Sequence, residues 1–139
     1  MPRPLLLVSL CLCLLALPAQ SQPRATVSTM DFVAILNDNH AEALHYYQNN
    51  WALMRERALA QGYIENFQLL QTPFDEEAPF HLVLITSYPS LEHYQNREAN
   101  FQRVMDELNS PDFLNDKRPA DFRQLLFSKE AVRHLSPAN

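Results

Sequence analysis

The spacing of apolar residues predicts four short strands along residues 30–128. Residues 30–36 (MDFVAIL) and 80–88 (FHLVLITSY) are nearly continuous apolar runs, which are typical of buried strands. Residues 63–72 (YIENFQLLQT) alternate in part between apolar and polar, which suits an edge strand, and residues 121–127 (DFRQLLF) predict a last strand. A helix that begins already near residue 30 is the competing interpretation of the first run.

Two further segments repeat apolar side chains at three- and four-residue steps, as one face of an α-helix requires. In the first segment these side chains are Leu44, Tyr47, Trp51, Met54 and Ala58. Asp38 or Asn39 would cap the start of this helix, and Gly62, the only glycine in the chain, would end it. The second helix is predicted over residues 91–109, with Ser90 as its cap. Its apolar positions are Leu91, Tyr94, Phe101, Met105 and Leu108.

This order of elements predicts an α+β fold, the ferredoxin-like βαββαβ arrangement. It has a four-stranded antiparallel sheet with two helices on one face. The second face of such a sheet stays uncovered, and the run at residues 80–88 is apolar on both of its sides. A second copy of the chain is the simplest cover for that face, so we expect a homodimer.

Residues 1–21 are predicted to be a secretory signal peptide. They hold one early cation, an apolar run at residues 5–17 and small residues near the end. Cleavage after Ser21 is the first expectation, and cleavage after Ala19 is the alternative. The protein is therefore expected to be secreted or periplasmic, with a flexible lead-in at residues 22–29 and a tail at residues 129–139 beside the domain.

Composition excludes several classes of function. Both cysteines lie in the signal segment, so the mature domain has no disulfide, thiol nucleophile or iron–sulfur cluster. A single glycine excludes the Rossmann, P-loop and nucleophile-elbow motifs, which need several. Removal of Arg3 with the signal takes the net charge from −5 to −6. An acidic domain repels phosphate, so we expect neither nucleic acid nor a membrane as partner.

Several local patterns together resemble the dimeric α+β barrel superfamily. They are a tryptophan late in the first helix followed by Arg55, the helix-ending Gly62, the YIENFQLL and FHLVLITSY strands, and REANF in the second helix. The resemblance covers about residues 30–128. It implies two sheets packed face to face across a dimer, and a small-ligand cleft between the sheet and the helices.

That superfamily includes cofactor-free quinone-forming monooxygenases, polyketide cyclases, haem-degrading monooxygenases, dye-decolorising peroxidases and muconolactone isomerases. The pattern of the haem-degrading branch is an Asn on the first strand, with a Trp and an iron-ligating His on or near the second helix. Asn37 and His93 match that pattern, but the only tryptophan, Trp51, lies on the first helix. This departure argues against haem, and we expect no cofactor.

Candidate catalytic residues are expected at one edge of the sheet. This topology brings four places to that edge. They are the end of the first strand, the start of the first helix, the turn before the third strand and the start of the last strand. Asn37, His40, His81 and Arg123 should therefore converge there, beside the positive end of the first helix. Because imidazoles suit proton transfer, His40, His81 and Arg123 are the candidate catalytic residues, and Asn37 is a candidate ligand-binding residue. The alternative is two solvated histidines and an arginine paired to a nearby acid.

The predicted cleft supplies the other candidates. Tyr47, Trp51 and Phe101 are candidate ligand-binding residues, with Trp51 buried between helix and sheet and Tyr47 at the cleft edge. The alternative is that these rings only fill the core. Glu42 and His45 have the spacing of a helical metal pair, but an ion pair on the helix surface is the favoured interpretation, and no metal is expected.

The sequence thus predicts an exported dimer that binds a small aromatic or polyketide-like molecule. Cofactor-free oxygenase, isomerase or cyclase activity is the catalytic option, and a non-catalytic exported dimer is the alternative. A second edge of the sheet collects Tyr63, Tyr88 and His93, so the sequence leaves open both the position of the site and whether the protein is an enzyme.

Overall fold

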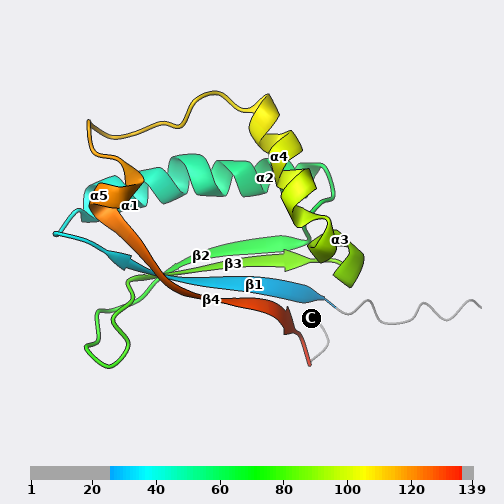
Figure 1. The fold of residues 1–139 in the computed structure, drawn as a ribbon, viewed down its shortest axis with the longest axis horizontal. Helices are drawn as coiled ribbons and strands as arrows, with labels where there is room; N and C mark the ends of the chain where they lie inside the picture. Colours follow the sequence, from blue (N-terminus) through cyan, green and yellow to red (C-terminus); the bar gives the residue numbers. More distant parts are fainter. Residues whose placement is uncertain (1–25, 136–139) are drawn as a thin grey trace, which may run out of the picture.

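The computed structural model describes residues 26–135, so the predicted signal segment lies outside the described residues. The fold is α+β, with one four-stranded antiparallel sheet in the order β2-β3-β1-β4. Its strands are β1 (Val27–Ile35), β2 (Asn66–Gln71), β3 (Leu82–Tyr88) and β4 (Arg123–Arg133). This arrangement is compatible with a ferredoxin-like α+β fold, and Figure 1 shows the helices gathered on one face of the sheet.

The first predicted helix is a single rod along the sheet, made of three consecutive pieces (Figure 1). They are α1 (His40–Tyr46), a π-helix η1 (Tyr47–Trp51) and α2 (Ala52–Ala60). The second predicted helix is broken at Asn96 into α3 (Leu91–Gln95) and α4 (Arg97–Glu107). A short α5 (Pro119–Phe122) precedes β4 and occupies the start of the predicted last strand.

The predicted caps at Gly62 and Ser90 are confirmed, whereas Asn39 precedes α1 without a capping hydrogen bond from its side chain. Gly62 has φ +73°, and it ends α2 because Tyr63 N–H donates to the Ala58 carbonyl at 2.9 Å and Gly62 N–H to the Leu59 carbonyl at 3.0 Å. This pair of bonds is the Schellman motif that a left-handed glycine permits. Ser90 caps α3 by accepting a hydrogen bond from His93 N–H at 3.3 Å.

Two strands are longer than the sequence predicted. β1 begins at Val27, inside the predicted flexible lead-in, because the polar Ser28 is buried and satisfied by the Ser87 hydroxyl at 2.8 Å. β4 continues to Arg133, through the first residues of the predicted tail. Its outer half is mostly exposed, so it carries no apolar signal, and it pairs with β1 through register shifts near Met30 and Val33.

The core lies between the helices and one face of the sheet. Its largest cluster comprises Val33, Ile35, Ala43, Tyr47, Trp51, Leu82, Leu84 and Phe122. The predicted burial of Trp51 is confirmed, with 8% of the residue exposed. Tyr47 was expected at the cleft edge, which is wrong: at 2% exposed it lies deeper than Trp51. Within η1 the buried residues are Tyr47 and Trp51, so both rings face the sheet.

The opposite face of the sheet is apolar at its centre. Val33 belongs to the core, so strand alternation places Phe32 on the other face. The Phe32 ring stacks on Phe127 at 4.4 Å between centroids and meets the edge of Phe80 at 5.0 Å. Phe127 on β4 and Leu70 on β2, at the two edges of the sheet, remain 46% and 43% exposed, and Figure 1 shows the helices on the far side.

Candidate functional site

A π-helical turn marks the middle of the first helical rod. Such turns are rare and frequent at functional sites, because the wider turn breaks the regular ladder of backbone hydrogen bonds. Asn49 Nδ2 donates to the His45 carbonyl at 2.9 Å, and Asn50 Nδ2 donates to the Tyr46 carbonyl at 3.1 Å. These two side chains satisfy carbonyls in the region of the break. Side chains that bond to a carbonyl four residues earlier compete with the regular helical hydrogen bonds.

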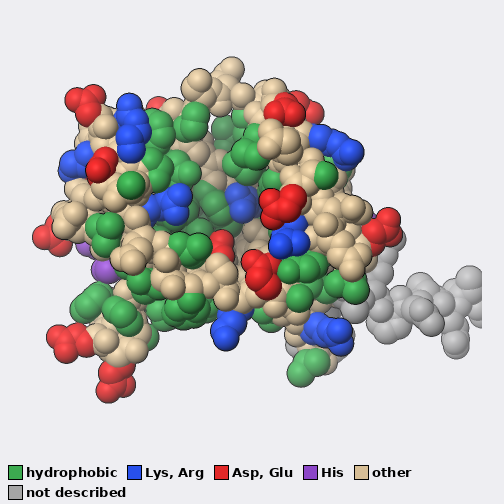
Figure 2. Space-filling model, viewed as in Figure 1, with side chains coloured by type: hydrophobic (Ala, Val, Ile, Leu, Met, Phe, Trp, Pro, Cys, Tyr) green, Lys and Arg blue, Asp and Glu red, His purple; other side chains and the backbone are tan. Residues whose placement is uncertain are grey.

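A cleft of about 180 Å³ lies between this turn and the sheet. Its floor comes from β1, β3 and β4, and its wall from the helical rod. The lining side chains are Asp31, Val33, Tyr46, Tyr47, Trp51, Arg55, Leu84, Arg123 and Leu125. Figure 2 shows this side of the molecule hollowed, with hydrophobic and Lys or Arg side chains in the hollow.

Arg55 is fixed between two aromatic rings. Its guanidinium carbon lies 4.3 Å from the centre of the Trp51 ring and 4.7 Å from that of Phe101. Its Nε donates to the Thr86 hydroxyl at 3.4 Å, and among residues 26–135 no carboxylate lies within 4 Å of it. Burial lowers the pKa of Arg55 to about 10, so the side chain remains a desolvated cation at neutral pH.

Arg123 faces the same cleft from the first residue of β4. Its guanidinium carbon lies 5.5 Å from the Tyr46 ring centre and 5.9 Å from the Tyr47 ring centre. Its Nε is buried and has no hydrogen-bond acceptor within the described part of the chain. Most buried N–H groups in proteins do have an acceptor, so this donor can bind an acceptor that the described residues do not supply.

Two more groups set the polarity of the cleft. Burial raises the pKa of Tyr47 to about 12, an effect that nearby Arg123 opposes, so the hydroxyl stays protonated and available to donate. Asp31 is the one carboxylate among the lining residues, and its Oδ1 accepts from the Ser128 hydroxyl at 2.5 Å. The cleft therefore combines two guanidinium cations, one carboxylate and a ring of aromatic side chains.

The predicted edge cluster is assembled only in part. The ring centres of His40 and His81 lie 5.4 Å apart, and both line a groove of about 630 Å³ with Asn37. His81 Nδ1 accepts from Ile35 N–H at 2.9 Å, and burial, with a smaller contribution from His40, lowers the pKa of His81. Arg123 is not in this groove. It pairs with Ile35 in register, and since Ile35 faces the core, Arg123 projects to the helix side.

Sequence reasoning found some of the cleft and missed the rest. It named Tyr47, Trp51 and Arg123, which line the cleft, and Phe101, which packs behind Arg55. It did not select Asp31, Tyr46 or Arg55 as site residues. For Arg55 a signal exists, because its position four residues after Trp51 places a cation against an aromatic ring on one helix face.

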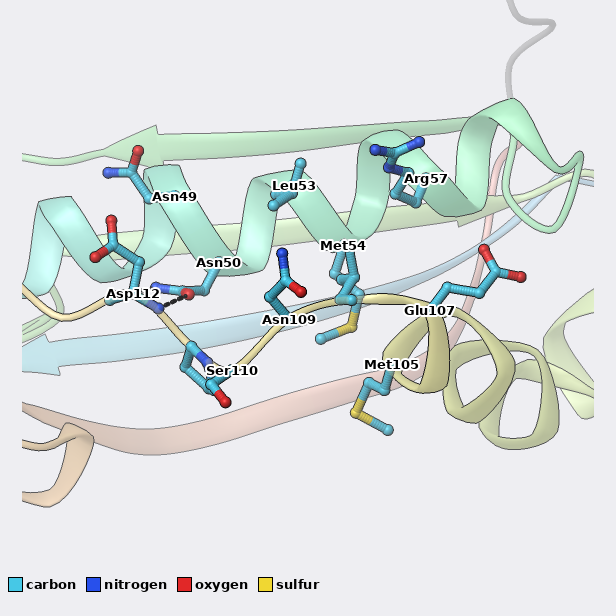
Figure 3. Close-up of a pocket in the computed structure, with 12 residues that line it drawn as sticks. Asn49, Asn50, Leu53, Met54, Arg57, Met105, Glu107, Asn109, Ser110 and Asp112 are labelled. Carbon is cyan, nitrogen blue, oxygen red and sulfur yellow. Dashed lines mark hydrogen bonds between the residues drawn. The ribbon is translucent and has the colours of Figure 1, made fainter.

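A wider groove of about 560 Å³ lies between α2 and the segment that follows α4 (Figure 3). Leu53, Met54 and Met105 form its apolar part. Asn50 ties the loop to the helix, since its side chain exchanges two hydrogen bonds of 2.7 Å with the backbone of Asp112. None of the residues that the sequence singled out as a site lines this groove.

The predicted ion pair between Glu42 and His45 does not form. Glu42 accepts from Lys117 Nζ at 2.7 Å, and His45 Nε2 lies 3.0 Å from the carboxylate of Asp112. Within residues 26–135, no group of three or more His, Cys, Asp or Glu side chains is placed to hold a metal ion. In the same residues, no helix is long and apolar enough to cross a membrane.

Comparison with protein-family models, with curated proteins and with solved structures finds no match. The resemblance to the dimeric α+β barrel superfamily therefore stays a prediction from the sequence. The geometry of the cleft is the remaining basis for assigning a function.

Proposed function

We propose that the protein binds a small aromatic molecule in the cleft beneath the π-helix. The observation that carries this proposal is the set of three aromatic side chains, Tyr46, Tyr47 and Trp51, around a recess of about 180 Å³. An apolar cavity of about 150 Å³ is enough to admit benzene in other proteins. The volume therefore favours one aromatic ring, and a larger polyketide-like molecule would have to extend beyond the cleft.

Trp51 provides a direct test, because it is the only tryptophan in the chain. We expect its fluorescence to change and saturate as benzoate, benzamide or phenol is added. Tyr47→Phe removes a donor from the cleft and should weaken binding, whereas Tyr63→Phe, outside the cleft, should not. Emission that stays constant with every compound up to millimolar concentration would contradict the proposal.

We also propose that two copies of the chain pair through the uncovered sheet face, as in a dimeric α+β barrel. The stacked Phe32 and Phe127 and the exposed Leu70 support this, since such a patch is unfavourable in water. Light scattering should give twice the monomer mass. Phe127→Asp should yield monomers, whereas Leu91→Asp, at a similarly exposed apolar residue on α3, should leave the dimer intact. A wild-type monomer at micromolar concentration contradicts the pairing.

Export completes the proposal. The predicted signal segment would send the dimer out of the cytoplasm, and the mass of the mature chain would show whether cleavage follows Ser21 or Ala19. The alternative function is a non-catalytic exported dimer, which the apolar sheet face favours by itself. The two functions differ in one measurable result, because the alternative predicts a dimer whose cleft binds none of the aromatic compounds.

A further inference from the structure

We propose that the cleft selects an aromatic carboxylate, whose negative charge is held by Arg123 and Arg55. This inference rests on the proposed aromatic-binding function and adds the charge and the chemical class of the ligand. It starts from Arg123 Nε, a buried donor without an acceptor in the described residues. A carboxylate is the acceptor that a guanidinium binds best, through two parallel hydrogen bonds.

The surroundings of the two arginines make their charge available. Neither forms an ion pair of 4 Å or less within residues 26–135. Each contacts aromatic rings: Arg55 lies against Trp51, and Arg123 lies near Tyr46. Aromatic faces hold a guanidinium in place while its N–H groups donate in the guanidinium plane. Arg55 Nε donates to the Thr86 hydroxyl and Arg55 Nη1 to Met54 Sδ, so its remaining N–H groups are the ones that can bind a ligand.

The charge balance of the cleft favours a single negative charge. Two guanidinium groups and the carboxylate of Asp31 line the cleft, which leaves one net positive charge. A monoanion neutralises that charge, whereas a dianion such as a phosphate ester would be repelled by Asp31. The protonated Tyr47 hydroxyl is a further neutral donor for a carboxylate oxygen, and the volume of about 180 Å³ suits one ring.

The test compares benzoate with benzamide, which has nearly the same shape and no charge. Binding is followed by Trp51 fluorescence at neutral pH and fixed ionic strength. We expect benzoate to bind about tenfold more tightly, or better, because charge-assisted hydrogen bonds are about twice as strong as neutral ones. Arg123→Gln should reduce benzoate affinity to that of benzamide and leave benzamide nearly unchanged.

Two further variants complete the design. Arg55→Gln should also reduce the preference for benzoate, and it provides a second arginine test if Arg123→Gln does not fold. Arg57→Gln removes an exposed cation two residues along the same helix and should leave the preference intact. This control separates a local contact from a general effect of positive charge near the cleft.

Each result decides a specific point. Equal binding of benzoate and benzamide overturns the charge selection but leaves the aromatic-binding function standing. If benzoate, benzamide and phenol all fail to bind, both the charge selection and the aromatic-binding function are overturned. A preference for benzoate that survives in both arginine variants places the carboxylate elsewhere, and tighter binding of phenyl phosphate than of benzoate overturns the single-charge assignment.

Discussion

Replacement of Trp51 by alanine should remove a large part of the stability of this domain. The side chain is 8% exposed, meets the Phe67 ring edge-on at 5.8 Å and lies under the Arg55 guanidinium at 4.3 Å. A buried tryptophan removes about 150–250 Å² from water, which at about 25 cal/mol per Å² amounts to ~4–6 kcal/mol. The remaining alanine and the relaxation of the cleft reduce this, so we expect a loss of about 3–5 kcal/mol. That is a large fraction of the ~5–15 kcal/mol that stabilises a typical domain.

Urea unfolding followed by circular dichroism measures this loss, since the variant has no tryptophan left to fluoresce. Leu59→Ala is the matched control, because Leu59 lies on the same helix and is 43% exposed. Its loss should stay well below that of Trp51→Ala. A loss under ~1 kcal/mol for Trp51→Ala would refute the packing argued here, because a buried ring cannot be removed so cheaply.

Three further predictions test local features. In Gly62→Ala the added Cβ meets no steric clash, but the residue must keep a φ of +73°, so the free energy of unfolding should fall by about 1 kcal/mol. A more stable variant in the same urea assay would contradict this. Glu42 has a pKa lowered to about 2, chiefly by its hydrogen bond to Lys117, so its contribution to stability should be present above pH 4.5 and decline as the pH falls toward 2. The pH profiles of wild type and Glu42→Gln should therefore converge in that range, and parallel profiles would contradict the pairing. Burial lowers the pKa of His81 from 6.5, so as the pH drops below 6.5 the unfolded chain gains a proton before the folded one and the stability should fall. An NMR titration midpoint of His81 at or above 6.5 would argue against the buried acceptor at Nδ1.

The general fold was predictable because its signals are local. Apolar runs gave β1 and β3, the three- and four-residue spacing gave the first helix, and Gly62 gave its end. The parts of the fold that the sequence did not predict are held by contacts between residues far apart in the chain. The start of β1 depends on the bond between Ser28 and Ser87, and the outer half of β4 is an exposed edge whose side chains carry no apolar pattern.

The candidate site was predictable to the extent that it follows the helix face. Tyr47 and Trp51 share the apolar stripe, so the sequence placed both against the sheet. Tyr47 was expected at the cleft edge, whereas it is 2% exposed and belongs to the main core cluster. The spacing of apolar residues also does not show the π-turn at η1, where Asn49 and Asn50 donate to the His45 and Tyr46 carbonyls.

The position of Arg123 shows why shared edges are weaker evidence than shared faces. The sequence grouped Arg123 with His40 and His81, since the segments that carry them meet at one end of the sheet. Strand alternation separates them, however, because Arg123 pairs with the core residue Ile35, whereas His81 directly precedes the core residue Leu82. The arginine therefore enters the aromatic cleft and the histidines line a separate groove. Pairing register fixes the face of the sheet on which each side chain lies. It therefore decides which polar residues share a site and what net charge that site carries.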